Sequence, residues 1–388
     1  MIKEFFDKVR PHVEEGGKFH AFRSLFDGFE TFALVPNTTS KTGVAIHDAI
    51  DSKRIMSFVV IALLPALLVG MYNIGYQNYT RADVEASCLV MFAYGLAVMI
   101  PKIVVSYVVG LGIEFVVAQW KKEEIQEGYL VSGMLIPMIV PVATPLWMLA
   151  VAVAFSVVFA KEIFGGTGMN IFNPALVARA FLFFAWPTWM SGDKVWVNTS
   201  SFLGLGCDIQ NPDALTCATP LGEAAAGIAP TVSPMEMMCG LMPGSIGETS
   251  VIAIAIGAAI LLLTRIASWK TMGSVFVGGA LMALLFDAVG SADNMVAHLG
   301  INHLWLGGFC FGAVFMATDP VTSCRTEKGK YIYGFLIGVL AITIRVLNPG
   351  YPEGMMLAIL FMNMFAPLID YCFVQRNINK RAKRTANR

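Results

Sequence analysis

The sequence predicts an all-α polytopic membrane protein with ten transmembrane helices. Hydrophobic residues make up 56% of the 388 positions, charged residues make up 14%, and the mean hydropathy is +0.66. Soluble domains carry about 25% charged residues, so this composition excludes an ordinary soluble protein. The apolar residues fall into ten runs, which predict spans at 55–72, 86–120, 129–140, 146–158, 174–186, 251–263, 273–289, 304–316, 332–344 and 355–373.

The first runs differ in length, and the differences predict their shapes. A spanning helix needs about 20 apolar residues at a rise of about 1.5 Å each. The run 86–120 is long enough to extend beyond the bilayer, and Pro101 within it predicts a kink. The runs 129–140 and 146–158 are short, and the PVATP segment between them predicts broken or re-entrant helices.

The runs divide into two sets of five, one on each side of a long polar segment, so related halves would be inverted relative to one another. A weak internal echo supports such halves. Each half has a break rich in Thr and Pro, a helix, an Asn-Pro pair, and an apolar helix that runs to a proline, at residues 135–187 and again at 315–367. Inverted repeats of interrupted helices place binding sites near the middle of the membrane.

Basic residues predict the orientation. The N-terminal segment, alternate loops and the end of the chain carry nearly all Lys and Arg, whereas the opposite side receives Arg81 and Lys194. By the positive-inside rule both termini are cytoplasmic, and the charged N-terminus shows no cleavable signal peptide. The predicted parts are a cytoplasmic N-terminal arm (1–54), a first five-helix repeat (55–187), a periplasmic loop (188–250), a second five-helix repeat (251–373) and a basic cytoplasmic tail (374–388).

Ionisable residues inside the predicted spans are costly and usually functional. They are Lys102, Glu114, Arg179, Asp287, Asp319, Arg345 and Asp370. Each also has a structural interpretation: Lys102 and Glu114 could snorkel or pair within one helix, and the two arginines could be structural charges of the two halves. Asp319, in an ATDP segment, is either an N-cap at a helix break or an oxygen ligand for a monovalent cation, and the two roles are compatible. Asp370 lies near the cytoplasmic end, where it could simply face lipid headgroups.

Other motifs exclude several cofactors. The seven cysteines show no CxxC or CxxCH spacing, so the sequence predicts no zinc, haem or iron–sulfur site, and it assigns neither metal ligands nor catalytic residues. Cys207, Cys217 and Cys239 share one loop, and a disulfide among them stays open. The run FGGTGMN (164–170) lacks the spacing of a phosphate-binding loop and follows an apolar helix, so it predicts a tight re-entrant turn.

The segment DALTCATP (213–220) places Thr219 in a turn of small residues within the polar loop. Because Pro220 and then Leu-Gly-Glu follow it, Thr219 has the pattern of a helix N-cap. A threonine hydroxyl so placed is also a site for esterification by a flavin phosphate, which would make the protein a redox carrier. The motif alone favours the N-cap, and the rest of the chain favours the attachment site.

Several longer segments resemble one family over essentially the whole chain. They are KEIFGGTGMNIFNPAL (161–176), RAFLFFA (179–185), SGD (191–193), PGSIGE (243–248), FMATDP (315–320) and RVLNPGYPEGMMLAIL (345–360). They are similar to segments of the B subunits of bacterial sodium-translocating NADH:quinone oxidoreductases, and the related D subunits of Rnf complexes share the core. The charged N-terminal arm, with EGGK at 15–18 and DSKR at 51–54, favours the quinone-reducing enzyme.

The resemblance implies a fold of ten helices in two inverted five-helix repeats, similar to urea transporters, and an electron-carrying flavoprotein. FMN would be joined by a phosphoester to Thr219, the last residue of the family's attachment motif, and Asp213 and Thr216 match the upstream positions of that motif. Cys217 stands where the family often has Gly. A non-covalent riboflavin is also implied, without assigned contacts.

The resemblance implies partners as well. Electrons would come from the FMN-bearing C subunit and pass to quinone, while sodium is exported across the bacterial inner membrane. The A subunit, the iron–sulfur D and E subunits of the membrane and the NADH-oxidising F subunit would complete the complex, with lipid around it and no nucleic acid. This chain would not act alone, because it carries no NADH-binding fingerprint of its own.

The resemblance further assigns a quinone residue and an ion pathway. Gly110 matches the first glycine of the family's quinone-site pair, and Leu111 replaces the second. Acidic positions tied to sodium uptake match Asp27, Glu114, Asp319 and Asp370. Two alternatives stay open: a D subunit of an Rnf-type complex, and a flavin-free channel or transporter with the urea-transporter fold.

Overall fold

The computed structural model describes residues 2–13, 26, 30, 33, 34, 43, 52–121, 128–209, 217–290, 294–348 and 353–386, and its regular elements in these ranges are helices. The helices, in chain order, are α1 (Ile2–Val13), α3 (Ser52–Arg81), α4 (Cys88–Lys121), α5 (Tyr129–Ile139), α6 (Leu146–Ser156), η2 (Val157–Glu162), α7 (Pro174–Ala185), α8 (Pro187–Met190), α9 (Pro220–Ala225), α10 (Pro234–Cys239), α11 (Val251–Leu263), α12 (Trp269–Val289), η4 (Ala297–Leu304), α13 (Phe309–Phe311), η5 (Gly312–Met316), α14 (Gly329–Leu347) and α15 (Met355–Ala386).

The protein is a polytopic membrane protein by the length and composition of its helices. Five described helices (α3, α4, α12, α14 and α15) are long and apolar enough to cross a bilayer, and a sixth span forms if the pair bent by 44° around residues 305–308 counts as one. The helices α5, α7 and α11 are shorter and apolar. Each of the ten predicted runs thus contains a helix, and the predicted break between α5 and α6 is confirmed.

One predicted run is wrong at its start. The sequence predicts a continuous span over 304–316, whereas the structure places there the second half of a broken pair that begins at Ala297. Gly300 and Gly307, with φ of +52° and +58°, take left-handed backbone conformations that favour glycine, so the chain turns at these points. The segment from 312 to 316 then continues as a π-helix.

A buried cation satisfies backbone carbonyls at each of the two breaks. Lys102 donates to the carbonyl oxygen of Pro141 at 3.0 Å and to that of Val142, in the break between α5 and α6. Arg345 of α14 donates to the carbonyl oxygens of His303 at 2.6 Å and Leu306 at 2.9 Å, in the broken pair. Because unpaired carbonyls are costly in an apolar surrounding, the breaks depend on these two side chains.

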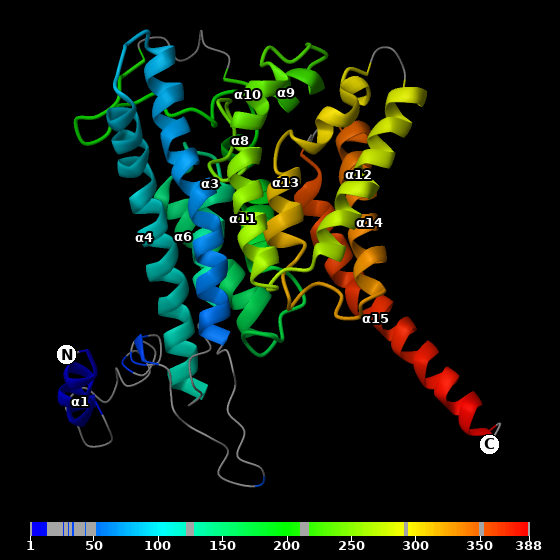
Figure 1. Ribbon diagram of the computed structural model, residues 1–388. Coiled ribbons are helices and arrows are strands. Elements are labelled where there is room, and N and C mark those ends of the chain that lie inside the picture. Colours follow the sequence, from blue (N-terminus) through cyan, green and yellow to red (C-terminus); the bar gives the residue numbers. More distant parts are fainter. Residues whose placement is uncertain are drawn as a thin grey trace.

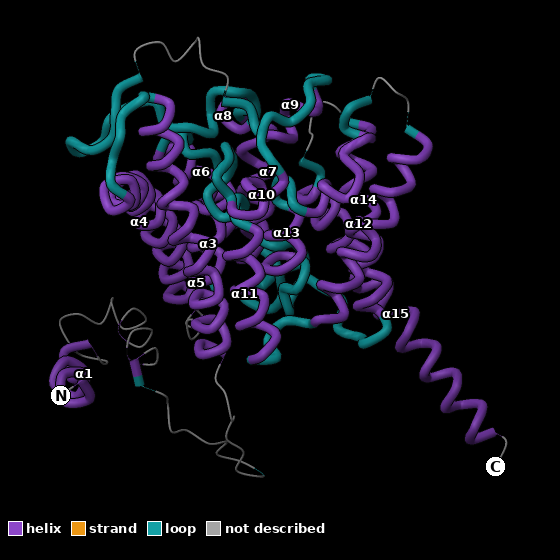
Figure 2. Tube along the Cα trace, turned by 45° about the horizontal axis from the view of Figure 1, so that its top comes forward, coloured by secondary structure: helices purple, strands orange, loops and turns teal. Residues whose placement is uncertain are grey.

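Figures 1 and 2 show how these helices assemble. The helices α3 and α4 lie side by side on one flank, and α12, α14 and α15 form the other. The short helices α8, α9 and α10 cover one end of the bundle, and both labelled termini lie toward the opposite end, beyond which the last part of α15 extends (Figure 1). The described residues of the predicted loop 188–250 therefore form a folded cap over this end of the bundle, and this segment is called the cap below.

Candidate functional site

A cavity of about 220 Å³ lies beneath the cap, and Thr219 is one of its lining residues. Three segments that are far apart in the sequence line it together: SGD (191–193), the start of α9, and the PGSIGE segment (243–248). The polar lining groups come from both predicted halves, because Arg179 lies on α7 and Glu353 precedes α15. Four of the six segments that carry the resemblance therefore meet around one space.

The N-cap interpretation of Thr219 is confirmed. Thr219 has an extended backbone, and its Oγ1 accepts a hydrogen bond from the N–H of Gly222 at 3.1 Å, which begins the six-residue helix α9. Thr219 thus lines the cavity while it caps α9. Asp213 and Thr216, the upstream positions of the motif, lie outside the described residues.

Cys217 anchors the attachment segment to the end of α3. Its Sγ accepts a hydrogen bond from Nη1 of Arg81 at 2.8 Å, and Nε of Arg81 donates to Gln77 at 3.2 Å. Arg81 is one of the two basic residues that the positive-inside pattern leaves on the outer side, and this contact gives it a structural partner. All seven cysteines are among the described residues and are free, so the three in this loop form no disulfide.

A buried ionic cluster forms one wall of the same cavity. Arg179 donates to Oε1 of Glu248 at 2.6 Å and to Oε2 of Glu353, and Ser245 donates to Oε2 of Glu248. Arg345 holds the backbone of Glu353, donating from Nε to its carbonyl oxygen at 2.8 Å. Sequence reasoning missed both glutamates, although each stands beside glycine in one of the family-like segments, PGSIGE and YPEGM.

Glu114 pairs with a different residue than expected. Its partner is Lys161 on the π-helix η2, and neither side chain is more than 6% exposed. The hypothesis that Glu114 and Lys102 pair within one helix is therefore wrong, because the two cations lie at separate places: Lys102 at a helix break and Lys161 at the ion pair. A second cavity of about 80 Å³ borders Lys161 and Asp319.

Gly110 lies against an aromatic ring. A Cβ atom at this position would be 2.0 Å from Cε1 of Tyr129, whose hydroxyl is 3.0 Å from that of Ser106. Glycine is thus required for α4 and α5 to approach each other. The neighbouring Leu111 is half-buried, and a quinone contact at Gly110 stays a prediction.

Asp319 joins the two halves. Its Oδ2 accepts from Nδ2 of Asn173 at 3.2 Å and from Oγ1 of Thr322 at 3.0 Å, and its Oδ1 accepts from the N–H of Val321 at 3.0 Å. Asn173 is itself the N-cap of α7, through its Oδ1 and the N–H of Ala175. Turns follow Asp319 and the next helix, α14, begins only at Gly329, so the interpretation of Asp319 as a helix N-cap is wrong. Asp319 instead holds the turn that follows it and links this turn to the N-cap of α7.

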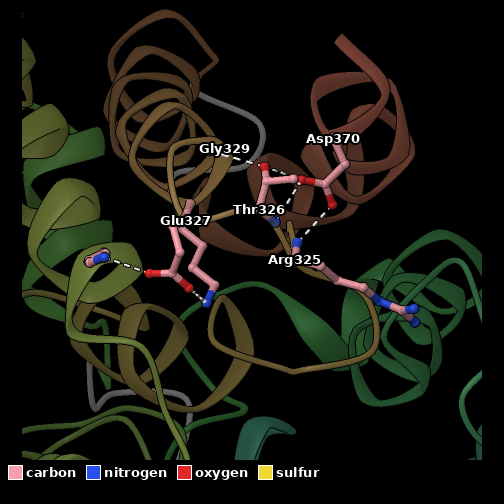
Figure 3. A network of polar contacts seen from close by, with 7 residues as sticks. Arg325, Thr326, Glu327, Gly329 and Asp370 are labelled. Atoms are coloured by element: carbon pink, nitrogen blue, oxygen red, sulfur yellow. Dashed lines mark hydrogen bonds and ion pairs between the residues drawn. The ribbon is translucent and has the colours of Figure 1, made fainter. Parts of the chain in front are cut away.

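Asp370 and the loop before α14 form a separate network at the opposite end from the cap (Figure 3). Asp370 accepts from the backbone N–H groups of Arg325 at 2.7 Å and Thr326 at 3.0 Å and from the hydroxyl of Thr326. Glu327 pairs with Lys270 and Lys330, and hydrogen bonds from these two lysines lower the pKa of its carboxyl to about 2. The Asp370 carboxylate thus fixes this loop.

The predicted residues do not converge on one centre. Thr219 lies under the cap, Asp319 and the Glu114 partner Lys161 line the second cavity, Gly110 packs on Tyr129, and Asp370 lies at the other end. Asp27 is outside the described residues. Asp287 is 46% exposed and lies 3.4 Å from His298. Within the described ranges no group of three or more His, Cys, Asp and Glu is arranged to hold a metal.

Comparison of the sequence with known proteins gives the same family that the motifs indicate. A sequence model of the NQR2, RnfD, RnfE family matches residues 39–379. The chain is 44% identical over 407 residues to the B subunit of the Na(+)-translocating NADH-quinone reductase of Chromohalobacter salexigens, covering 99% of this chain and 97% of that protein. It is 42% identical over 415 residues to the protein of the same name from Pseudomonas aeruginosa, and 42% identical over 422 residues to that from Klebsiella pneumoniae, covering 99% of each chain.

Proposed function

The chain belongs to the NQR2, RnfD, RnfE family, and on that premise we propose that it is the B subunit of a Na⁺-translocating NADH-quinone reductase. In this role it receives electrons from the FMN-bearing C subunit and delivers them to quinone, while sodium is exported. When bound, a covalent FMN and a riboflavin supply the one-electron chemistry of that transfer. The other partners are the A, D, E and F subunits, in a bacterial inner membrane.

The observation that carries the proposal is the placement of Thr219. Thr219 lines a cavity together with the SGD and PGSIGE segments. The cavity fits a polar group that the chain itself does not supply, because Oγ1 of Thr249, another lining residue, is buried without a hydrogen-bond partner among the described residues. Thr219 would hold FMN through its side-chain oxygen, and Asp213 and Thr216 would belong to the sequence that the attaching enzyme recognises.

A covalent bond suits this position under the cap. A tethered group stays at high local concentration whatever its intrinsic affinity, and the cap helices α8, α9 and α10 lie at one end of the bundle (Figure 1). If that end faces the periplasm, an attaching enzyme and a redox partner there can reach it. The hydrogen bond between Arg81 and Cys217 then holds the attachment segment against the end of α3.

We further propose that ten helices enter the membrane as two inverted five-helix repeats of the urea-transporter kind, at 55–187 and 251–373. Two features support it: each half contains a break whose carbonyls a buried cation holds, and the Asn173–Asp319 bond joins the Asn-Pro pair of the first half to the ATDP break of the second. Both termini are cytoplasmic and the loop 188–250 is periplasmic in this arrangement, which agrees with the termini lying opposite the cap. The arm 1–54 and the tail 374–388 are the cytoplasmic extensions.

Quinone and sodium residues belong to the same proposal. Gly110 lies near quinone, and Glu114, Asp319, Asp370 and Asp27 influence the passage of sodium. The second cavity supports this for two of them, because Lys161, the partner of Glu114, and Asp319 both border it.

Substitution of Thr219 tests the flavin attachment. We expect Thr219→Ala to abolish the flavin fluorescence of this chain in a denaturing gel, and we expect Thr231→Ala, a hydroxyl of the same loop that donates to Glu223, to keep it. A mass of the wild-type chain with no addition, after expression with the attaching enzyme, would favour the flavin-free channel instead. Quinone reduction by the purified complex would separate the proposal from an Rnf-type D subunit.

A further inference from the structure

The buried cluster of Glu248, Arg179 and Glu353 has a geometry that simple packing does not require. Two carboxylates share one guanidinium, and their side chains are 7%, 5% and 14% exposed in that order. Both carboxylates also approach Gly308, where an added Cβ would lie 2.4 Å from Oε1 of Glu248 and 2.6 Å from Oε1 of Glu353. The two Oε1 atoms are therefore within about 5.0 Å of each other.

Burying such a cluster is expensive. Charges lose solvation when they leave water, and apolar residues of the same volume often give equal or greater stability. Only a glycine at position 308 leaves room for both carboxylates. Arg345 holds Glu353 in place by a hydrogen bond to the backbone carbonyl oxygen of Glu353. The protein thus holds three charges rigidly at one wall of the cavity that Thr219 borders.

Rigid charges beside a redox group act on its reduction potential. An electron that enters a buried site interacts with fixed charges strongly, because little water is present to screen them. Charges already held in place also need no reorganisation when the electron arrives. The hydrogen bonds from Arg179 and Ser245 and the contact with Gly308 hold these carboxylates in that way.

We propose that Glu248, Arg179 and Glu353 are positioning residues that set the reduction potential of the flavin carried by Thr219. The proposal rests on the proposed function and adds to it the groups that tune the cofactor. Arg179 stabilises the added negative charge, and the two carboxylates hold Arg179 in place while opposing that charge. The cluster also connects the cavity to the broken pair of helices, since Leu221 of α9 and Arg345 both border Gly307.

The test is a redox titration of the purified whole complex, in which the Thr219-linked flavin is identified by its difference from the Thr219→Ala complex. Glu248→Gln and Glu353→Gln each remove a negative charge and keep the shape, so each should raise the potential. We expect the equilibrium between oxidised and one-electron-reduced flavin to change about tenfold, which corresponds to about 59 mV. Arg179→Gln should lower the potential.

Controls separate tuning from folding. Arg179→Lys keeps the charge, so it should shift the potential less than Arg179→Gln; it also serves where loss of the charge prevents folding. Glu327→Gln removes a carboxylate at the opposite end of the bundle, and it should leave the potential unchanged. Fluorescence in a denaturing gel verifies that each variant still carries flavin.

The outcomes are distinct. Opposite shifts for the glutamine and arginine variants, with Glu327→Gln unchanged, support the proposal. Unchanged potentials in flavin-loaded Glu248→Gln and Glu353→Gln complexes would reduce the cluster to a structural ion network. Absence of flavin from the wild-type chain would instead overturn the proposed function, and the gel reveals that case before any titration.

Discussion

The ion pair of Glu114 and Lys161 shows at the scale of single residues how two distant parts of the chain neutralise each other. Their side chains are 6% and 4% exposed, and Oε2 of Glu114 has no further hydrogen-bond partner among the described residues. Removing one partner of a buried pair costs about 3–5 kcal/mol, because the other charge stays uncompensated. The pair therefore makes each of its members depend on the other.

We expect Glu114→Gln to lower the thermal stability of the purified complex and Lys161→Met to do the same. The double variant Glu114→Gln with Lys161→Met should regain most of the loss, since no unpaired charge then remains. Unfolding of the detergent-solubilised complex, followed by a thiol-reactive or intrinsic fluorescence signal, measures this cycle. Strictly additive losses would show that the two side chains do not interact.

Sequence reasoning at this scale found the right residue types but few of their partners. It gave Thr219 a helix N-cap correctly, because that pattern is local in the chain. It also predicted an N-cap at Asp319, where the structure has a turn and no helix begins. It could not predict that Arg179 pairs with Glu248 and Glu353, because these contacts join residues that are 69 and 174 positions apart in the sequence. Such pairings depend on the packing of helices, which a local motif does not encode.

At the scale of elements, two acidic residues of the predicted ion pathway differ in what they hold. Asp319 links the cap of α7 to the segment after η5, beside the second cavity. Asp370 accepts hydrogen bonds from the Arg325 and Thr326 backbone and so fixes the loop before α14 (Figure 3). Asp319 lines the second cavity, whereas the contacts of Asp370 described above all go to the loop before α14.

We therefore expect Asp319→Ala to weaken the sodium dependence of turnover while leaving the bound flavin unchanged. Asp370→Ala should affect turnover mainly by loosening its loop, visible as faster amide hydrogen exchange at Arg325 and Thr326. Sodium titrations of quinone reduction, with hydrogen exchange on the same preparations, measure both effects. Equal sodium curves for the wild type and Asp319→Ala would return Asp319 to a purely structural role.

The whole molecule was predictable where apolar runs are long. All ten runs contain helices, because continuous apolar sequence leaves the backbone no partner except itself. The break near 305–308 was not foreseen, although the Gly307-Gly308 pair within it is a turn signal. The contacts of Arg345 that hold the break come from another helix, which a local motif does not encode. Of the cap helices only the start of α9, at Thr219, was predicted, because α8, α9 and α10 are at most six residues long.

The orientation of this whole assembly decides which side the cap faces. Lys and Arg resist transfer across the membrane, so the basic end of α15 should stay in the cytoplasm and the cap should face outward.

Leu203 in the cap is 80% exposed, and Thr385 lies in the exposed end of α15. We expect a membrane-impermeant maleimide to label Leu203→Cys in intact spheroplasts and Thr385→Cys only after lysis. The background should lack the four native cysteines that are not buried, which are Cys88, Cys207, Cys239 and Cys372. Labelling of Thr385→Cys before lysis would show the opposite orientation. The cap would then face the cytoplasm, where a periplasmic attaching enzyme could not reach Thr219.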